Sequence, residues 1–215
     1  MFIGHFALGF AAKRAAPRIS LGTLFAASQL PDLLWPVLVA LGIEHVRIAP
    51  GATAFTPLEF VSYPYSHSLL FVAIWGLAFG GLYGLRLHGF RAVAVIALLV
   101  VSHWVLDWVT HAPDMPLYPG GPAYGLGLWY SVPGTIVVES ALFVAGTWTY
   151  ARLTRPRDAT GRWGFVSLVA LLVIAYVANI VAGPPPSIEA LWMVSLAGAA
   201  VTLVMALWID GHRTI

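Results

Sequence analysis

Residues 91–111 read RAVAVIALLVVSHWVLDWVTH, and this stretch decides how the rest of the chain is interpreted. Its first half is as apolar as a lipid-embedded helix, and the whole is long enough to cross a hydrocarbon core about 30 Å thick. Its second half places His103, Asp107 and His111 at intervals of four residues, which puts them on one face of a helix. An ionisable side chain at such a depth costs about 2.5–3.5 kcal/mol on insertion scales, so it is normally paired and functional. The stretch therefore predicts a membrane span with a reactive polar face.

The composition of the whole chain agrees with a membrane protein. Apolar residues make up 60% of the 215 residues and charged residues 9%, whereas a soluble domain carries about 25% charged residues. The net charge of +2 comes mainly from arginines in short connections, so it concerns membrane topology and predicts no nucleic-acid partner. The chain has no cysteine, which excludes disulfides and thiolate metal sites.

Long apolar runs bounded by charge, proline or glycine define the predicted fold. We expect an all-α fold, a polytopic membrane helix bundle of about six spans plus a short N-terminal helix at 1–12. The candidate spans are 20–42, 67–85, 91–111, 134–151, 163–182 and 190–209. We expect a single integral membrane domain over 1–215, with the site-bearing part at about 1–140 and a C-terminal helix pair at 163–209.

Basic residues are concentrated in every second connection. The segments KRAAPR (13–18), RLHGFR (86–91) and RLTRPRDATGR (152–162) hold nine of the eleven Lys and Arg residues. The alternate connections, 43–66, 112–133 and 183–189, contain Arg47 as their only strong base. By the positive-inside rule, the arginine-rich segments and the C-terminus are predicted to be cytoplasmic and the other connections to face outward.

Ionisable residues inside the predicted spans all fall in the outer half of the membrane. They are Asp32 in SQLPDLLWP, His67 in YPYSHSLL, His103, Asp107, and Glu139 in TIVVESALF. The N-terminal helix, packed beside the first span, brings His5 to the same level. Pro31 and Pro36 remove helix hydrogen bonds from the first span, so we expect that span to be broken or tilted near Asp32. The sequence therefore predicts that these side chains converge on one polar site.

The residue types at this predicted site indicate a metal centre. Imidazole and carboxylate groups without sulfur suit a divalent transition metal, with zinc the first choice and Mn²⁺ or Fe²⁺ as alternatives. His103 and Asp107 can share one ion, whereas His111 lies about 12 Å along the helix axis from His103 and suits a second ion, a supporting role or the substrate. The candidate ligands, for one or two ions, are His5, Asp32, His67, His103, Asp107 and His111. Asp32 and Glu139 are the candidate catalytic proton acceptors. For any one of these residues, the alternative is ordinary hydrogen bonding inside the bundle.

The sequence also resembles a known family. The segments FIGHFALGFAAKR, LPDLLWP, YPYSHSLL, SHWVLDWVTHAPDMPLYPGG and GLGLWYSVPGTIVVE lie within the first 140 residues or so. They are similar to the LexA-binding, inner-membrane-associated hydrolases, which are also described as membrane-bound metal-dependent hydrolases. A more distant likeness is to the helical zinc phospholipase C and nuclease group, whose ligand set this chain matches in part. The resemblance implies a prokaryotic inner-membrane protein with a His/Asp metal centre matched to the residues above.

Three classes of function are compatible with these observations. The first is a metal-dependent hydrolase that acts at the outer membrane surface on a lipid or lipid-linked ester, with a phosphoester as the preferred substrate class. No GxSxG motif is present, so a serine hydrolase is not expected. The second is a metal-ion or proton-coupled transporter, in which buried His and carboxylate groups bind and release the cargo. The third is a membrane scaffold or interaction protein with a structural metal, as the LexA association of the similar family suggests.

Overall fold

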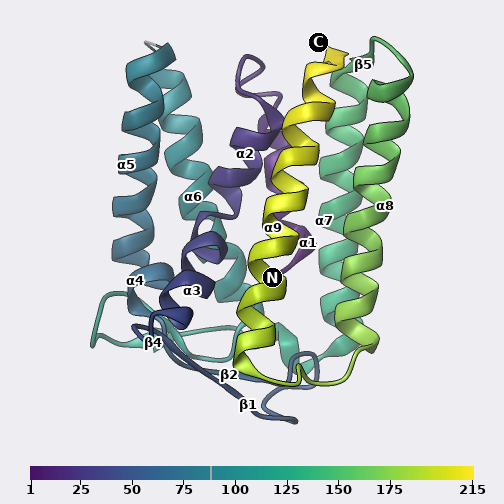
Figure 1. The fold of residues 1–215 in the computed structure, drawn as a ribbon. Helices are drawn as coiled ribbons and strands as arrows, with labels where there is room; N and C mark the ends of the chain where they lie inside the picture. The colour runs from purple at the N-terminus through teal and green to yellow at the C-terminus, as the bar shows by residue number, and fades with distance from the viewer. Residues whose placement is uncertain (88) are drawn as a thin grey trace.

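A computed structural model describes residues 1–87 and 89–215 of the chain as a bundle of helices with short hairpins at its ends (Figure 1). The predicted connection 86–91 contains His88, which lies outside the described residues. The described helices are α1 Ile3–Ala12, α2 Leu21–Ser28, α3 Leu30–Ala40, α4 Pro64–His67, α5 Leu69–Leu87, α6 Phe90–Thr110, α7 Val132–Leu153, α8 Ala159–Val181 and α9 Ile188–Gly211, with a 3-10 turn, η1, at Leu128–Tyr130. The described strands are β1 His45–Ile48, β2 Leu58–Ser62, β3 Met115–Pro116, β4 Ala123–Tyr124, β5 Arg155–Pro156 and β6 Arg213–Thr214.

The long helices account for most of the predicted membrane spans. Among the described residues, α6, α7, α8 and α9 are long and apolar enough to cross a membrane, and α2 with α3 makes a fifth candidate if the bent pair is one span. The predicted span at 67–85 corresponds to α4 and α5, and the apolar part of α5 that is described, Leu69–Leu85, is shorter than these helices. The chain is therefore a mostly helical protein with four to five candidate spans. The sixth span stays a prediction.

The first candidate span is broken, as its prolines predicted. Helices α2 and α3 meet at Gln29 with a bend of 58°. Pro31 has no N–H to donate to the carbonyl four residues earlier, and its ring collides with that carbonyl in a straight helix. In an unbroken helix the Ser28 carbonyl would accept the Asp32 N–H, whereas here it accepts a hydrogen bond from His103 Nδ1 at 2.8 Å. The break therefore turns a backbone carbonyl toward α6.

The short helix α1 lies inside the bundle rather than on its surface (Figure 1). It packs against α7, α2 and α6, and Phe10 on its buried face meets Phe25 of α2 edge to face at 4.8 Å between ring centroids. Gly146 of α7 allows the closest approach, because a Cβ at that position would collide with the backbone of Ala7. This packing brings the start of α1 against the parts of α6 and α7 that lie nearer the ends carrying Asp107 and Glu139.

Helices α5 and α6 form a close pair through a stripe of glycines. Gly76, Gly80 and Gly84 follow one another at four-residue spacing, and a Cβ at Gly76 or Gly80 would lie 2.9 or 2.8 Å from a backbone carbonyl oxygen of α6. Small residues at this spacing let helix backbones approach in lipid, where dispersion and packing drive association. The stripe holds α6, which carries the predicted reactive face, against α5.

The two ends of the bundle differ in character (Figure 1). At one end, here called the hairpin end, lie the connections 43–66, 112–133 and 183–189, with the antiparallel pairs β1–β2 and β3–β4. At the opposite, arginine-rich end lie the 13–18 and 152–162 connections and the β5–β6 pair. The all-α prediction describes the bundle, but the hairpins were not predicted. Which end faces the cytoplasm stays a prediction.

A buried ion pair holds the arginine-rich end together. Lys13 Nζ donates to Asp210 Oδ2 at 2.6 Å and to the Ile19 carbonyl at 2.8 Å. The same carboxylate accepts the Tyr150 hydroxyl at 2.8 Å and the Leu21 N–H at 3.1 Å. Asp210 thus joins α9 to α7, to the start of α2 and to the turn after α1.

Candidate metal centre

Four helices contribute side chains to one polar cluster in the half of the bundle nearer the hairpin end. His5 comes from α1, Asp32 from α3, His67 from α4, and His103 and Asp107 from α6. The sequence placed all five at one depth, and the structure brings them together in two overlapping groups, His5–His103–Asp107 and Asp32–His67–His103. Within each group the candidate ligand atoms lie within 4.8 Å of one another. The predicted convergence is therefore what the structure shows, while the binding of an ion stays a prediction.

The closest convergence involves two imidazole nitrogens and two carboxylate oxygens. Asp32 Oδ1 lies 3.4 Å from His67 Nε2 and 3.7 Å from His103 Nε2. Asp107 Oδ2 lies 3.7 Å from His67 Nε2 and 3.0 Å from His103 Nε2. Ligands bonded to zinc at about 2.0–2.1 Å in a tetrahedron are separated by about 3.3–3.4 Å. The four imidazole–carboxylate separations are thus close to those between ligands of one small ion.

The hydrogen bond of His103 determines which of its nitrogens faces the cluster. Its Nδ1 lies 2.8 Å from the Ser28 carbonyl, which only accepts, so Nδ1 carries the proton. In the neutral ring, Nε2 then presents a lone pair to Asp107 Oδ2, and it has no hydrogen-bond partner among the described residues. A cation between these two atoms would satisfy both of them, as would a second proton on the ring. A bond from the outer ring nitrogen to a carbonyl is also the usual support of a metal-binding histidine.

His5 is packed beside this group and contacts the same carboxylate. Its ring stacks on His103 with 3.7 Å between ring centroids, and its Nε2 lies 3.0 Å from Asp107 Oδ1. The amino group of Met1 also contacts Asp107 Oδ1. Asp107 therefore has one oxygen toward His5 and the other toward His67 and His103. A second ion between His5, His103 and Asp107 stays a prediction.

Exposure distinguishes Asp32 from the other members of the cluster. The side chains of His5, His67, His103 and Asp107 are at most 5% exposed, whereas that of Asp32 is 42% exposed. Because α3 begins at the break in the first span, its first turn lies at the edge of the cluster rather than inside it. The cluster therefore has four buried members and one carboxylate, that of Asp32, at its exposed edge.

Glu139 lies outside both ligand groups and supports the start of α1 instead. Its Oε2 accepts the N–H groups of Phe2 at 2.8 Å and Gly4 at 3.3 Å, which are unsatisfied donors of the first turn of that helix. Its Oε1 is buried without a hydrogen-bond partner among the described residues. The structure thus shows an anchoring contact for Glu139, and the predicted catalytic role is untested.

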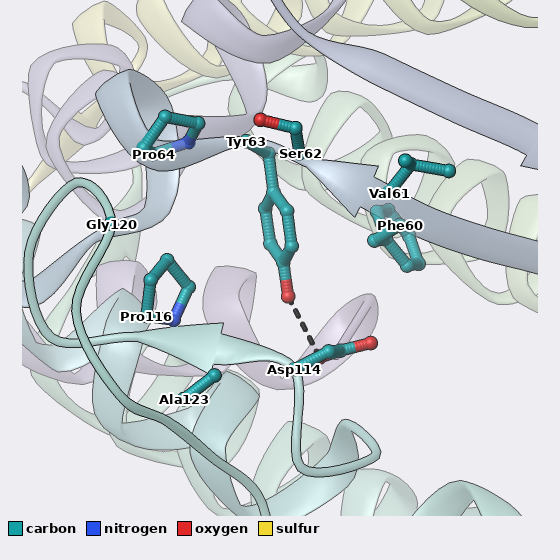
Figure 2. A pocket seen from close by; sticks show the side chains of 9 residues that line it. All are labelled: Phe60, Val61, Ser62, Tyr63, Pro64, Asp114, Pro116, Gly120 and Ala123. Atoms are coloured by element: carbon teal, nitrogen blue, oxygen red, sulfur yellow. Dashed lines mark hydrogen bonds between the residues drawn. The ribbon is translucent and has the colours of Figure 1, made fainter.

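His111 also lies outside both ligand groups, at the end of α6. Its Nδ1 lies 3.0 Å from Asp114 Oδ1, and Tyr63 donates its hydroxyl to the same oxygen at 2.7 Å (Figure 2). Burial lowers the pKa of His111, although the neighbouring Asp114 opposes this change, and burial raises the pKa of Tyr63. The structure places His111 in a network with Asp114, and its predicted role as a ligand is untested.

A pocket of about 310 Å³ opens beside this network at the hairpin end (Figure 2). Its lining includes Phe60, Tyr63, Asp114 and Pro116, and the phenol of Tyr63 points across it toward Asp114. The Tyr63 ring also lies 5.2 Å from the His67 ring, measured between centroids. Tyr63 therefore stands between the pocket and the His/Asp cluster.

Two residues that sequence reasoning missed lie behind His67. Ser66 Oγ is 2.7 Å from His67 Nδ1, and the buried Glu44 accepts the Ser66 hydroxyl. Glu44 lies in a connection without helical periodicity, so nothing in its sequence context distinguished it from a solvated loop residue. In the Ser66–His67–Ser68 sequence, only the histidine has a side chain typical of a metal ligand, so nothing in the pattern indicated the role of Ser66.

The fold and the cluster define a multi-pass membrane protein whose helices enclose buried groups with the spacing of metal ligands. Residues 1–185 match the family described as YdjM inner membrane protein, and the chain belongs to this family. It is therefore a multi-pass inner-membrane protein, and every residue of the cluster lies within the matched part. No curated protein and no solved structure matches the chain. The LexA-binding and hydrolase resemblances stay predictions.

Proposed function

We propose that this protein is a membrane-bound metal-dependent hydrolase that cleaves a lipid or lipid-linked phosphoester. His67, His103 and Asp107 would hold one divalent ion, zinc in the first instance, with Asp32 on its open side. The observation that carries the proposal is that two imidazole nitrogens each lie 3.0–3.7 Å from two carboxylate oxygens inside an apolar bundle. Three protein ligands with one accessible position are typical of catalytic rather than structural zinc.

The chemistry follows from the different exposure of the four groups. An ion in this position lowers the pKa of a water toward about 7 and polarises a phosphoryl oxygen. Asp32, whose side chain is 42% exposed, is placed to accept a proton from water entering on the open side. The hydrogen bond that His103 Nδ1 donates to the Ser28 carbonyl keeps the imidazole turned toward the cluster while Asp32 takes up and releases that proton.

The location of the cluster supports a substrate at the membrane surface. The ligands lie in the half of the bundle nearer the hairpin end, which the arginine distribution predicts to be the periplasmic side. The pocket beside Tyr63 opens at the same end (Figure 2). A lipid phosphate at headgroup level is the ester that such a site meets first, and its negative charge suits a cationic centre.

The interior on the other side of the cluster favours hydrolysis over transport. From His5, α1 runs toward the arginine-rich end past Phe6 and Phe10, which pack with Phe25 and Phe143 in an apolar aromatic core. A transported ion needs a polar path from its site to the second side of the membrane. In this arrangement aromatic rings fill the region between the cluster and Lys13.

A hydrolysis assay with a matched pair of variants tests the proposal. The purified protein, loaded with Zn²⁺ in liposomes, is expected to release product from one of a panel of phospholipids and isoprenoid-linked phosphoesters. Asp32→Asn is expected to lower turnover by roughly 10²- to 10⁴-fold while metal content is retained, because only the proton acceptor is lost. Glu59→Gln, an exposed acid paired with Arg47 in the hairpin, is the control and should keep full activity. Zinc-loaded protein that cleaves no ester in the panel, or an Asp32→Asn variant with full turnover, would contradict the proposal.

A further inference from the structure

A buried chain of polar groups backs His67 on the side away from the cluster. Glu44, Ser66 and His67 are all at most 4% exposed. Glu44 Oε1 accepts the N–H groups of Tyr65 and Ser66, each at 2.8 Å. Glu44 Oε2 accepts the Ser66 hydroxyl at 2.5 Å, and Ser66 Oγ lies 2.7 Å from His67 Nδ1. The chain thus joins the connection after α3 to the imidazole through α4.

The direction of each hydrogen bond in this chain follows from the donors available. A carboxylate only accepts, so the single hydroxyl proton of Ser66 is committed to Glu44. Ser66 Oγ can then only accept from the imidazole, which places a proton on His67 Nδ1. In the neutral ring, Nε2 is left with a lone pair, and this nitrogen faces Asp32 Oδ1 at 3.4 Å.

We propose that Glu44 and Ser66 are positioning residues that fix the tautomer and the orientation of His67, so that its Nε2 lone pair is directed into the cluster. The importance of this tautomer for metal binding rests on the proposed function. The tautomer itself is inferred from the hydrogen bonds of Glu44, Ser66 and His67 alone. The N–H groups of Tyr65 and Ser66 in α4 donate to the Glu44 carboxylate and hold it in place. Glu44 therefore satisfies the first backbone N–H groups of α4 and also determines the direction of the hydrogen bonds that lead through Ser66 to His67. His103 reaches the same state by another route, through the Ser28 carbonyl.

Substitution of Glu44 by glutamine reverses the donor and acceptor roles along the hydrogen bonds from residue 44 through Ser66 to His67, with almost no change of side-chain volume. The amide oxygen keeps the two backbone N–H bonds, and the amide NH₂ then faces Ser66 Oγ as a donor. Ser66 must accept that bond and turn its own proton to His67 Nδ1, which becomes an acceptor. The imidazole proton then moves to Nε2 and points into the cluster, where it blocks a ligand position.

Nitrogen NMR of histidine-labelled, metal-free protein in detergent micelles tests the proposal directly. The His67 signals are assigned by their loss in His67→Ala, and the expected wild-type state has a protonated Nδ1 and an unprotonated Nε2. In Glu44→Gln the protonated nitrogen is expected to be Nε2, while Glu59→Gln, the exposed control, keeps the wild-type pattern. A wild-type proton on Nε2, or a Glu44→Gln spectrum identical to wild type, would overturn the assignment.

Zinc titration of the same proteins separates this inference from the proposed function. Glu44→Gln is expected to weaken Zn²⁺ binding by about 10- to 100-fold, the usual effect of losing a bond that orients a metal ligand. If Glu44→Gln does not fold, Ser66→Ala takes its place, since it leaves both backbone bonds to Glu44 and is expected to give a mixture of tautomers. Wild-type protein that binds no zinc but has the expected tautomer contradicts the proposed function and supports the positioning role. Unchanged zinc affinity in a variant whose tautomer has moved would overturn the link to metal binding.

Discussion

The removal of His103 is the substitution whose effect the structure predicts most sharply. His103 belongs to both candidate ligand groups and is fully buried, so its removal takes a ligand from either arrangement of the ion. Structural zinc sites with four protein ligands bind with an apparent free energy of about 10–16 kcal/mol. If the three proposed ligands, His67, His103 and Asp107, share such an energy evenly, each contributes roughly 3–5 kcal/mol, which corresponds to roughly 150- to 5,000-fold in the dissociation constant.

The assay for this prediction is competition for Zn²⁺ against a chromogenic chelator, with purified protein in detergent. His103→Ala is expected to bind at least 100-fold more weakly than wild type. His45→Ala, which changes an exposed histidine in β1, is expected to bind like wild type. Both variants are checked for a monodisperse elution profile and wild-type helix content. A folded His103→Ala protein with wild-type affinity would show that the ion lies elsewhere and that His103 is not a ligand.

Three further predictions concern stability, pH and topology. Asp210→Asn leaves the buried Lys13 ammonium without its counter-charge, so the free energy of unfolding, measured by reversible denaturation, is expected to fall by about 3 kcal/mol. A loss within error of zero would contradict a stabilising ion pair at the arginine-rich end. Because burial lowers the pKa of His111 below its ordinary value of 6.5, the neutral ring stabilises the fold above that value and the contribution is lost as pH falls. Thermal stability is thus expected to decline less from pH 7.5 to 5.5 in His111→Gln than in wild type, and parallel declines would argue against the shift. An impermeant thiol reagent is expected to label Tyr124→Cys but not Arg157→Cys in intact cells, and the reverse pattern would invert the topology.

The site was predictable from sequence to the extent that membrane burial penalises charge. Asp32, His67, His103 and Asp107 were identified because a hydrophobic span has no reason to contain them unless they are paired, and the alternation of arginines placed them at one depth. The break at Pro31 was predictable for a similar reason, since proline removes a specific helix hydrogen bond. The cost of a charge in a membrane span and the loss of a helix hydrogen bond at proline both act locally, so the sequence alone indicated these two features.

The parts that sequence reasoning missed depend on contacts between segments far apart in the chain. Glu44 reaches Ser66 across a connection of irregular structure, and Lys13 reaches Asp210 across almost the whole chain. Lys13 was interpreted as a topology signal, although it is buried in an ion pair. His111 shares one face with His103 in an ideal helix, yet α6 ends at Thr110 and the ring turns to Asp114 instead. Such pairings have no local pattern that would reveal them.

X-ray absorption at the zinc edge decides whether His67, His103 and Asp107 bind a single divalent ion beside Asp32. The measurement uses wild-type protein purified without chelators and loaded with one equivalent of Zn²⁺. The expected spectrum has a first shell of nitrogen and oxygen atoms at about 2.0–2.1 Å, with outer-shell scattering from two imidazole rings that falls to that of one ring in His103→Ala. A spectrum without imidazole scattering, or one that His103→Ala leaves unchanged, would contradict this coordination.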